Sequence, residues 1–262
     1  MEWKKKIVFV AGGTSGINLA IAKHFASSGA WIAVLSRKPE KVEAAVQELQ
    51  AVGSNVKGFS ADVRDSTALE QALEWTAETW GPIDVVVSGA AGNFLSPAAH
   101  LSSNAFKTVI DIDLLGTFNV LRAAYRHLRK PGAAILNISA PQAWLPTPYQ
   151  VHACAAKAGI DQVTRTLAME WGRDGIRVNA IAPGPISGTE GMERLAPNPK
   201  VVKALISSIP AGRYGTKDEI AKAAMWLCSE EAAYVTGVVL PVDGGWSLGG
   251  SGTMMAAVAQ PD

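Results

Sequence analysis

The sequence predicts an α/β fold: a single domain built on a doubly wound parallel sheet of about seven strands, with helices on both faces. Short apolar runs rich in β-branched residues alternate with longer amphipathic segments along nearly the whole chain. This alternation is typical of strands that are buried on both faces and linked by crossover helices. The 262 residues contain no linker, internal repeat or low-complexity segment, and they are enough for one large core.

Each apolar run is continuous rather than alternating, which indicates a strand buried on both faces. In chain order, strands are expected at Ile7–Ala11, Trp31–Leu35, Val56–Phe59, Ile83–Val87, Ala133–Ile138, Arg177–Ile181 and Val238–Val242. The segments between them have helical periodicity. Helices are expected at Ile17–Ser28, Pro39–Val52, Ser66–Trp80, Asn104–Arg129, Tyr149–Trp171 and Lys217–Cys228.

The segment Pro183–Pro199 is too long, and too rich in glycine and proline, for an ordinary connection. Long connections in compact domains often form lids or ligand-binding loops. We therefore expect a substrate loop near residues 183–210, within one domain that spans residues 1–262.

Composition and charge exclude several classes of protein. Hydrophobic residues make up 48% of the chain and the net charge is +1, so neither disorder nor nucleic-acid binding is expected. No run of about 18 uncharged apolar residues occurs, so no membrane span is expected. Cys154 and Cys228 lie in apolar helical stretches without metal-ligand spacing, which predicts reduced core thiols, no metal site and a cytoplasmic location. Met1–Lys6 is basic, but a strand follows it rather than a signal sequence.

A glycine-containing turn follows the first expected strand and precedes the first expected helix. It reads Ala11-Gly12-Gly13-Thr14-Ser15-Gly16-Ile17. Glycines let the backbone approach a ligand, and the N-terminus of a helix attracts phosphate groups. The position of this turn favours a nucleotide site at Gly12, Thr14, Ser15, Gly16 and Ile17, with an ordinary strand-to-helix turn as the alternative.

Two cations, Arg37 and Lys38, follow the second expected strand. An acidic residue there would bind a free ribose 2′-hydroxyl, whereas two cations suit a 2′-phosphate and so favour NADPH over NADH. The alternative is a solvated pair before the start of the next helix. After the third strand, Asp62 and Val63 are placed to contact the adenine, although Asp62 could instead be a turn or capping residue.

Together these features resemble the short-chain dehydrogenase/reductase family over nearly the whole chain. The resemblance is carried by the Gly12/Gly16 turn, Ala90-Ala91-Gly92, Lys157, Arg177-Val178-Asn179, Pro183-Gly184 and Asp243-Gly244-Gly245. It implies a Rossmann-type fold and a nicotinamide cofactor. It also implies that further cofactor contacts come from Ala90, Ala91, Gly92, Lys157, Pro183, Gly184, Pro185, Ile186 and Thr189.

Two motif positions near the expected nucleotide site depart from the family pattern. The third glycine of the first turn is Asn18, which is expected to weaken close packing there. The first asparagine of the family's Asn-Ala-Gly turn is Ala90.

The catalytic positions depart further. Ala153 stands where the family has a tyrosine four residues before Lys157, and Ala140 stands where it has a serine. The family's helix asparagine is Asp113. A catalytically inactive NADP-binding sensor or subunit is therefore one alternative.

Four segments resemble more narrowly the 2,4-dienoyl-CoA reductases, especially the peroxisomal type. They are residues 91–97, 104–113, 151–153 and 182–191. That subfamily also lacks the tyrosine and has an aspartate at the helix position. The resemblance implies NADPH-dependent reduction of 2,4-dienoyl-CoA to enoyl-CoA in the oxidation of unsaturated fatty acids. The chain ends Ala259-Gln260-Pro261-Asp262 rather than in the peroxisomal tripeptide, which fits a bacterial-type cytoplasmic enzyme.

Such chemistry explains a missing tyrosine. A conjugated thioester takes hydride at the far end of the diene, so its charge moves to the thioester oxygen, and the proton goes to carbon. We expect Lys157 to hold the nicotinamide ribose and favour this dienolate, and Asp113 to orient Lys157 or a water. A purely structural ion pair is the alternative. The proton donor stays open among water, Tyr149 and His152.

An acyl-CoA needs contacts of its own. Phe94, Ser102, Ser103 and Asn104 follow the fourth strand, at the sheet edge where ligands gather, and are expected to bind it. Arg64 and Arg194 could neutralise CoA phosphates or simply be solvated. The segment 191–199 is expected to close over the acyl chain.

Two further expectations come from the family. Its members usually assemble as tetramers through their two long helices, here near Asn104–Arg129 and Tyr149–Trp171, so we expect a homotetramer. The other functional alternative is a reductase of another enoyl or oxoacyl thioester, the oxoacyl reaction being disfavoured without the tyrosine.

Overall fold

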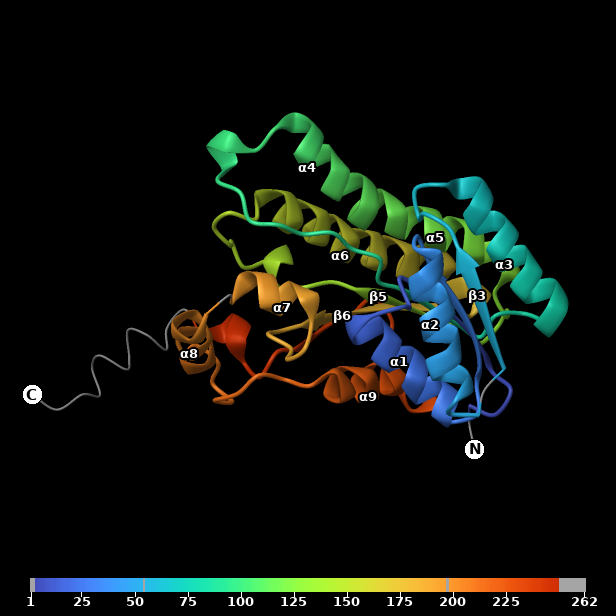
Figure 1. Cartoon of the computed structure of the whole chain (residues 1–262). Coiled ribbons are helices and arrows are strands. Elements are labelled where there is room, and N and C mark those ends of the chain that lie inside the picture. Colours follow the sequence, from blue (N-terminus) through green and yellow to red (C-terminus); the bar gives the residue numbers. More distant parts are fainter. Residues whose placement is uncertain (1–2, 54, 197, 250–262) are drawn as a thin grey trace, which may run out of the picture.

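Seven parallel strands form one sheet, so the carboxyl ends of all of them reach the same edge (Figure 1). The computed structural model describes residues 3–53, 55–196 and 198–249. The strand order is β3-β2-β1-β4-β5-β6-β7. The bounds are β1 Ile7–Ala11, β2 Trp31–Ser36, β3 Val56–Ser60, β4 Val85–Ser88, β5 Ala134–Ile138, β6 Arg177–Pro183 and β7 Val239–Val242. All the predicted strands are therefore confirmed.

Helices cover both faces of the sheet, as predicted for a doubly wound fold (Figure 1). One core contains Ile21 of α1, Leu49 of α2 and Ile220 of α9. The core on the other face contains Leu69 of α3 and Leu121 of α5, with α6 packed beside them. Burying each such side chain contributes about 1.5–3 kcal/mol. The bounds are α1 Gly16–Ser27, α2 Pro39–Gln50, α3 Ser66–Trp80, α5 Gly116–Ala124, α6 Val151–Trp171 and α9 Lys217–Cys228.

The helix predicted at Tyr149–Trp171 begins two residues later, as α6 at Val151. Tyr149 has a φ of 66°, a left-handed conformation that cannot continue a right-handed helix backwards. The residue is 59% exposed. The eight-residue spacing therefore does not place the phenol on the face of the helix that carries Lys157.

The segment predicted as one helix at Asn104–Arg129 is helical but not uniform. It consists of α4 Ser103–Val109, a π-helical turn at Ile110–Leu115, α5, and a short 3₁₀ turn that ends at His127. Asp113 lies in the π-helical turn. Such turns are frequent at functional sites, and they have no signature in hydrophobic periodicity.

The expected loop at Pro183–Pro199 is partly helical, which corrects the sequence-based prediction. β6 extends to Pro183, and α7 (Glu190–Leu195) and α8 (Pro199–Ser207) follow. Thr189 and Asn198 cap these helices by accepting from backbone N–H groups of the first turn. Pro197 lies outside the described residues, as do residues 250–262 and hence the C-terminal residues named above.

Both cysteines are free thiols. Burial raises the pKa of Cys228 to about 12, so this thiol stays protonated and unreactive. Over the described ranges, no helix is long and apolar enough to cross a bilayer, and no cluster of acidic, His and Cys side chains could hold a metal ion.

Candidate active site

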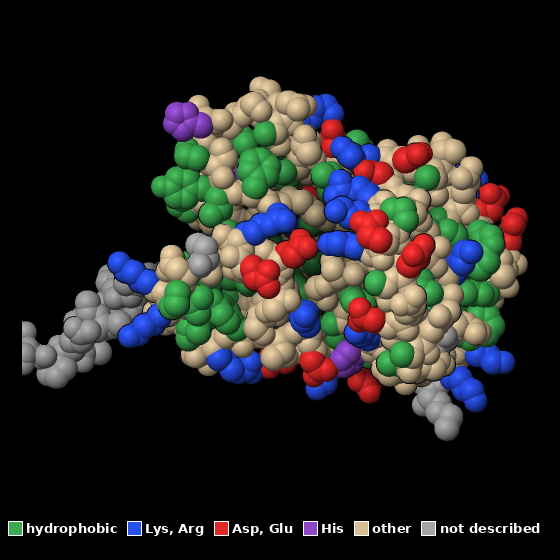
Figure 2. All heavy atoms as spheres, viewed as in Figure 1, with side chains coloured by type: hydrophobic (Ala, Val, Ile, Leu, Met, Phe, Trp, Pro, Cys, Tyr) green, Lys and Arg blue, Asp and Glu red, His purple; other side chains and the backbone are tan. Residues whose placement is uncertain are grey.

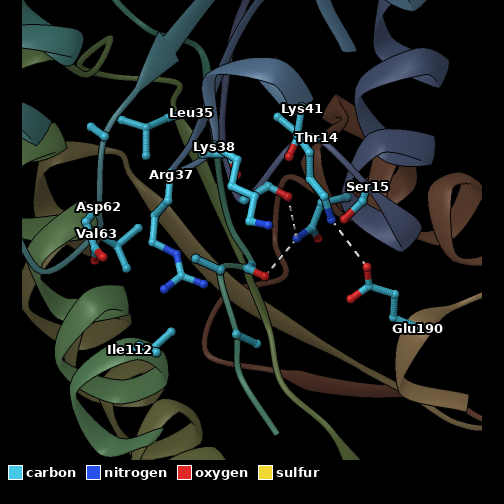
Figure 3. Close-up of a pocket in the computed structure, with 17 residues that line it drawn as sticks. Thr14, Ser15, Leu35, Arg37, Lys38, Lys41, Asp62, Val63, Ile112 and Glu190 are labelled. Atoms are coloured by element: carbon cyan, nitrogen blue, oxygen red, sulfur yellow. Dashed lines mark hydrogen bonds and ion pairs between the residues drawn. The ribbon is translucent and has the colours of Figure 1, made fainter. Parts of the chain in front are cut away.

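Two cavities open at the carboxyl edge of the sheet, where β1 and β4 are neighbours and the chain order reverses. The first, here the glycine-turn cleft, has a volume of about 230 Å³ (Figure 3). Its lining includes the predicted residues Gly12, Thr14, Ser15, Arg37, Lys38, Asp62, Val63, Ala90 and Ala91. The second, the central cavity, has a volume of about 570 Å³. Its lining includes the predicted residues Ile17, Ala91, Asp113, Lys157, Pro183, Gly184, Pro185, Ile186 and Thr189.

The glycine-turn cleft suits a phosphate group for two reasons. Its backbone lets a ligand approach closely, and the helix that begins there has no side-chain cap at its N-terminus. Gly12 has a φ of 77°, and a Cβ there would lie 2.7 Å from the backbone N of Ala90. Gly16 begins α1, whose N-cap residue Ser15 makes no side-chain capping bond. The first turn of α1 also has no acidic residue. Its N–H groups and the positive end of its dipole are therefore free to meet an anion.

Three cations also line this cleft, and on this face of the molecule Lys and Arg side chains gather around a hollow (Figure 2). Arg37 and Lys38 were predicted from the sequence, and Arg37 extends into the cleft in Figure 3. Lys41 was missed, although its place in the first turn of the next helix could have indicated it. The Nζ of Lys41 lies 3.3 Å from Oε1 of Glu190, which links α2 to α7 across the cleft.

Asp62 and Arg64 pair with each other. The Asp62 carboxylate accepts from Arg64 backbone N at 2.9 Å, Nε at 3.0 Å and Nη2 at 2.7 Å. The hydrogen bond from the Arg64 side chain holds the pKa of Asp62 below its ordinary value. Asp62 thus acts as the turn residue that the sequence allowed as an alternative, and it also lines the cleft. The Arg64 side chain is already paired with Asp62.

The central cavity contains a nearly buried ion pair. The Nζ of Lys157 lies 3.4 Å from Oδ2 of Asp113, and the two side chains are 11% and 2% exposed. Lys157 also donates to the carbonyl of Ile138 at 3.1 Å. Asp113 Oδ1 accepts from the backbone N of Gly92 at 2.7 Å. The structure therefore confirms that Asp113 and Lys157 meet, and it adds an anchor from Asp113 to the turn after β4.

The positions of the missing tyrosine and serine hold alanines, Ala153 and Ala140, which both line the central cavity. Ser139, beside the serine position, also lines the cavity, and its hydroxyl donates to Asp161 of α6. Burial raises the pKa of Asp161, although the Ser139 hydroxyl, Arg165 and Lys157 act in the opposite direction.

Neither candidate side-chain proton donor lines the central cavity. The Tyr149 side chain points into solvent, as its exposure shows. His152 is fully buried, and its Nε2 lies 3.1 Å from the carbonyl O of Phe94. The His152 ring also stacks on the Phe94 ring, with centroids 4.4 Å apart. This geometry makes His152 a support for Phe94.

The expected substrate residues outside the two cavities have other local contacts. Ser102 caps α4 by accepting from Ala105 N, and Ser103 and Asn104 begin that helix. The Nη1 of Arg194 donates to the carbonyl O of Asn93 at 3.4 Å, and its Nη2 lies 3.5 Å from Oε2 of Glu190. Phe94 is 39% exposed. For these residues, substrate binding stays a prediction.

The sequence analysis named no individual residue for part of the wall of the central cavity, although the substrate loop expected near residues 183–210 supplies five of these residues. This part of the wall includes Asn93, Gln142, Thr147, Gln150, Met192, Leu195, Val201, Ala204, Leu205 and Trp246. The apolar members come mainly from α7 and α8. The pattern of apolar residues in Pro199–Ser207 could have indicated a one-sided helix, but Trp246 is too distant in the chain to be assigned from sequence.

A family model described as "Enoyl-(Acyl carrier protein) reductase" matches residues 11–247. This chain belongs to the short-chain dehydrogenase/reductase family. Members of this family are oxidoreductases, so the chain is an enzyme of that class.

Curated relatives of this reductase cover most of its length. It is 47% identical to the peroxisomal 2,4-dienoyl-CoA reductase [(3E)-enoyl-CoA-producing] of Rattus norvegicus, over 92% of this chain and 83% of the relative. It is 42% identical to a probable 2,4-dienoyl-CoA reductase [(2E)-enoyl-CoA-producing] of Bacillus subtilis, over 92% of this chain and 96% of the relative. A short-chain dehydrogenase structure from Bacillus anthracis superposes with a TM-score of 0.84 at 40% identity, covering 93% of this chain and 97% of its own.

The geometry of this reductase divides the site into two functional regions. The glycine-turn cleft offers backbone N–H groups and cations, which suit a phosphorylated nucleotide of a nicotinamide cofactor. The central cavity offers one buried cation beside a largely apolar wall. The cavities share Ala91, so ligands bound in the two would adjoin.

Proposed function

We propose that this reductase converts 2,4-dienoyl-CoA to enoyl-CoA with NADPH, in the oxidation of unsaturated fatty acids. The observation that carries the proposal is the buried pair of Asp113 and Lys157 in a cavity without a hydroxyl at residue 153. A carbonyl substrate would lack an acid beside its oxygen there, whereas a conjugated thioester needs charge stabilisation and a proton on carbon. The names of the two curated relatives support the same substrate class.

NADPH is favoured by the residues that line the glycine-turn cleft. The uncapped N-terminus of α1 suits the pyrophosphate, and Arg37 and Lys38 suit a 2′-phosphate. The acidic members of the lining, Asp62 and Glu190, are each paired with a cation. When bound, the cofactor supplies the hydride.

Lys157 would stabilise the negative charge that develops on the thioester oxygen. Its ammonium can donate three hydrogen bonds, and within the described residues it makes one to Ile138 and an ion pair with Asp113. It therefore retains donor capacity toward the cavity that it lines. Asp113 holds Lys157 in place through the ion pair, while its other oxygen holds the Gly92 turn.

We propose water as the source of the proton that goes to carbon. Tyr149 is exposed and His152 supports Phe94, so neither faces the reacting atoms in the central cavity. The polar groups Asp113, Asn93 and Gln150 line that cavity and could hold a water there.

The acyl chain would lie against the apolar wall that α7 and α8 provide. Leu195, Val201, Leu205 and Trp246 form much of this wall. The half-exposed ring of Phe94 could pack on the CoA moiety. Arg194 of α7 is exposed and available to a CoA phosphate if it leaves Glu190.

A reductase of other enoyl thioesters is a second candidate, favoured by the description of the matching family model. The purified protein should be assayed with NADPH and 2,4-decadienoyl-CoA, an enoyl-CoA or an oxoacyl-CoA in parallel, following the loss of NADPH absorbance. Our proposal predicts that NADPH is oxidised in the presence of the dienoyl thioester and much less in the presence of the enoyl-CoA or the oxoacyl-CoA. Preference for the enoyl thioester would support the second candidate. Tight NADPH binding without oxidation by any thioester would indicate an inactive sensor or subunit.

We further propose a cytoplasmic homotetramer. Two free thiols are consistent with a reducing compartment. Apolar side chains are exposed on the two long helical segments, at Leu115, Phe118, Val151 and Met169, and association would cover them. Light scattering after size exclusion tests the assembly, and a Phe118→Lys, Met169→Lys variant should shift it toward smaller species.

A further inference from the structure

Two turns from distant parts of the chain meet beside the glycine-turn cleft, and one side chain joins them. The Nδ2 of Asn18 donates to the carbonyl O of Gly89 at 2.7 Å and to that of Gly12 at 3.3 Å. Gly12 belongs to the turn after β1, and Gly89 directly follows β4. All three residues line the cleft. The amide of Asn18 therefore ties together two of its walls.

The fit around Asn18 is close, and the residue is only 8% exposed. A Cβ at Gly89 would lie 2.4 Å from both Nδ2 and Oδ1 of Asn18, so the amide occupies the space that a side chain at residue 89 would need. The sequence predicted weaker packing where Asn18 replaces the family's glycine. The structure corrects this prediction, because glycine could make neither hydrogen bond.

The second departure from the family motif lies at the same contact. Ala90, where the family pattern has an asparagine, follows Gly89, and its backbone abuts the Gly12 turn. The chain thus lacks a carboxamide at residue 90 and has one on α1 that reaches Gly89. The Oδ1 of Asn18 is buried without a partner among the described residues. A buried oxygen without a hydrogen-bond partner is unfavourable, so Oδ1 does not explain why residue 18 is an asparagine. The two hydrogen bonds that Nδ2 donates do explain it.

We propose that Asn18 is a positioning residue for the cofactor, because it holds the Gly89–Ala91 turn against the Gly12 turn and so sets the width of the cleft. The inference rests on the proposed cofactor function. The bonds of Asn18 lie at the two glycine turns rather than at Arg37 and Lys38. Asn18 should therefore support NADPH and NADH equally.

The test compares the dissociation constants of NADPH and NADH, measured by nicotinamide fluorescence, in wild type, Asn18→Leu and Asn18→Gly. Leucine keeps the volume without the donor, and glycine restores the family residue. We expect both constants to rise about 5- to 20-fold in each variant, as for two lost buried hydrogen bonds. The KM for the cofactor should rise with a smaller change in kcat.

Asn137→Leu is a matched control. Asn137 is also buried, has an unpaired Oδ1 and donates to Thr164 Oγ1 at 2.9 Å, but it does not line the cleft. It should lower the melting temperature without changing cofactor affinity. The inference about Asn18 would be overturned if folded Asn18→Leu and Asn18→Gly proteins bound both cofactors with wild-type affinity, or if only the affinity for NADPH fell. The proposed function would not be affected by either result. Wild-type protein that binds neither cofactor would overturn the proposed function as well.

Discussion

Asp113 and Lys157 form an ion pair, with Oδ2 and Nζ 3.4 Å apart, that is nearly buried at the carboxyl edge of the sheet. The other oxygen of Asp113 accepts from the backbone N of Gly92 at 2.7 Å. One carboxylate thus connects the lysine of α6 with the turn after β4. Removing either partner leaves the other charge buried, so variants at this pair must separate its chemical role from its structural one.

Asp113→Asn makes this separation, because its amide oxygen can still accept from Gly92 while the charge is lost. We expect the kcat with 2,4-decadienoyl-CoA to fall about 100-fold or more, with NADPH affinity changed less than about 3-fold. Asp113→Ala should also weaken NADPH binding, because it loses the Gly92 contact. Stopped-flow binding and steady-state rates measure the two effects. A folded Asp113→Asn enzyme with near-normal kcat would remove this residue from the mechanism.

Arg37→Ala should change the choice of cofactor. Arg37 lines the glycine-turn cleft beside Lys38, where a 2′-phosphate would meet a guanidinium. Because a charge-assisted hydrogen bond contributes about 1.5–3 kcal/mol, we expect the KM for NADPH to rise roughly 10- to 100-fold and that for NADH to stay constant. Arg173→Ala, on the turn after α6, is the control and should change neither. Equal losses for both cofactors would mean that Arg37 does not read the 2′-phosphate.

The parts of this molecule that follow from sequence are those with a local signature. Strands buried on both faces leave continuous apolar runs, and the turn at Gly12 has the residues that close backbone approach requires. The π-helical turn at Asp113 follows from a shift in backbone hydrogen bonding that no residue type marks. The bonds of Asn18 and the place of Trp246 in the cavity wall depend on segments far away in the chain, so only the folded structure shows them.

Asp161 should make stability depend on pH in the direction that burial dictates. Burial raises the pKa of Asp161, so the folded protein retains a proton that the unfolded chain releases above about pH 4. The stability that the protonated Asp161 contributes to the folded state is fully present below about pH 4 and is lost as pH rises through the folded-state pKa. The Asp161→Asn side chain cannot ionise, so the variant does not lose this stability as pH rises. Its amide oxygen can still accept from the Ser139 hydroxyl.

The Asp161→Asn variant should therefore be more stable than wild type at pH 7 and nearly equal to it near pH 4. Urea unfolding at several pH values measures this difference. A difference that is constant with pH, or that favours wild type at pH 7, would show that Asp161 is not held protonated by burial.

Leu205→Trp should shorten the range of acyl chains accepted. Leu205 of α8 lines the central cavity, and a larger side chain there would reduce the apolar space for an acyl chain. We expect kcat/KM for long dienoyl thioesters to fall at least about 10-fold more than for short ones, as overpacking costs about 1–3 kcal/mol. Lys203→Ala, on the same helix but outside the lining, should leave the profile unchanged. A uniform loss at all chain lengths would place the acyl chain elsewhere.

The central claim is that the site delivers a solvent proton to carbon through a water near Asp113 and Lys157, without a tyrosine. The most direct measurement is the mass of the product formed from NADPH and 2,4-decadienoyl-CoA in deuterium oxide, with rates for wild type and Asp113→Asn. The account predicts an enoyl-CoA with a single carbon-bound deuterium, formed rapidly by wild type and at least about 100-fold more slowly by the variant. An enoyl-CoA product without carbon-bound deuterium, absence of an enoyl-CoA product, or equal rates for the two proteins would contradict it.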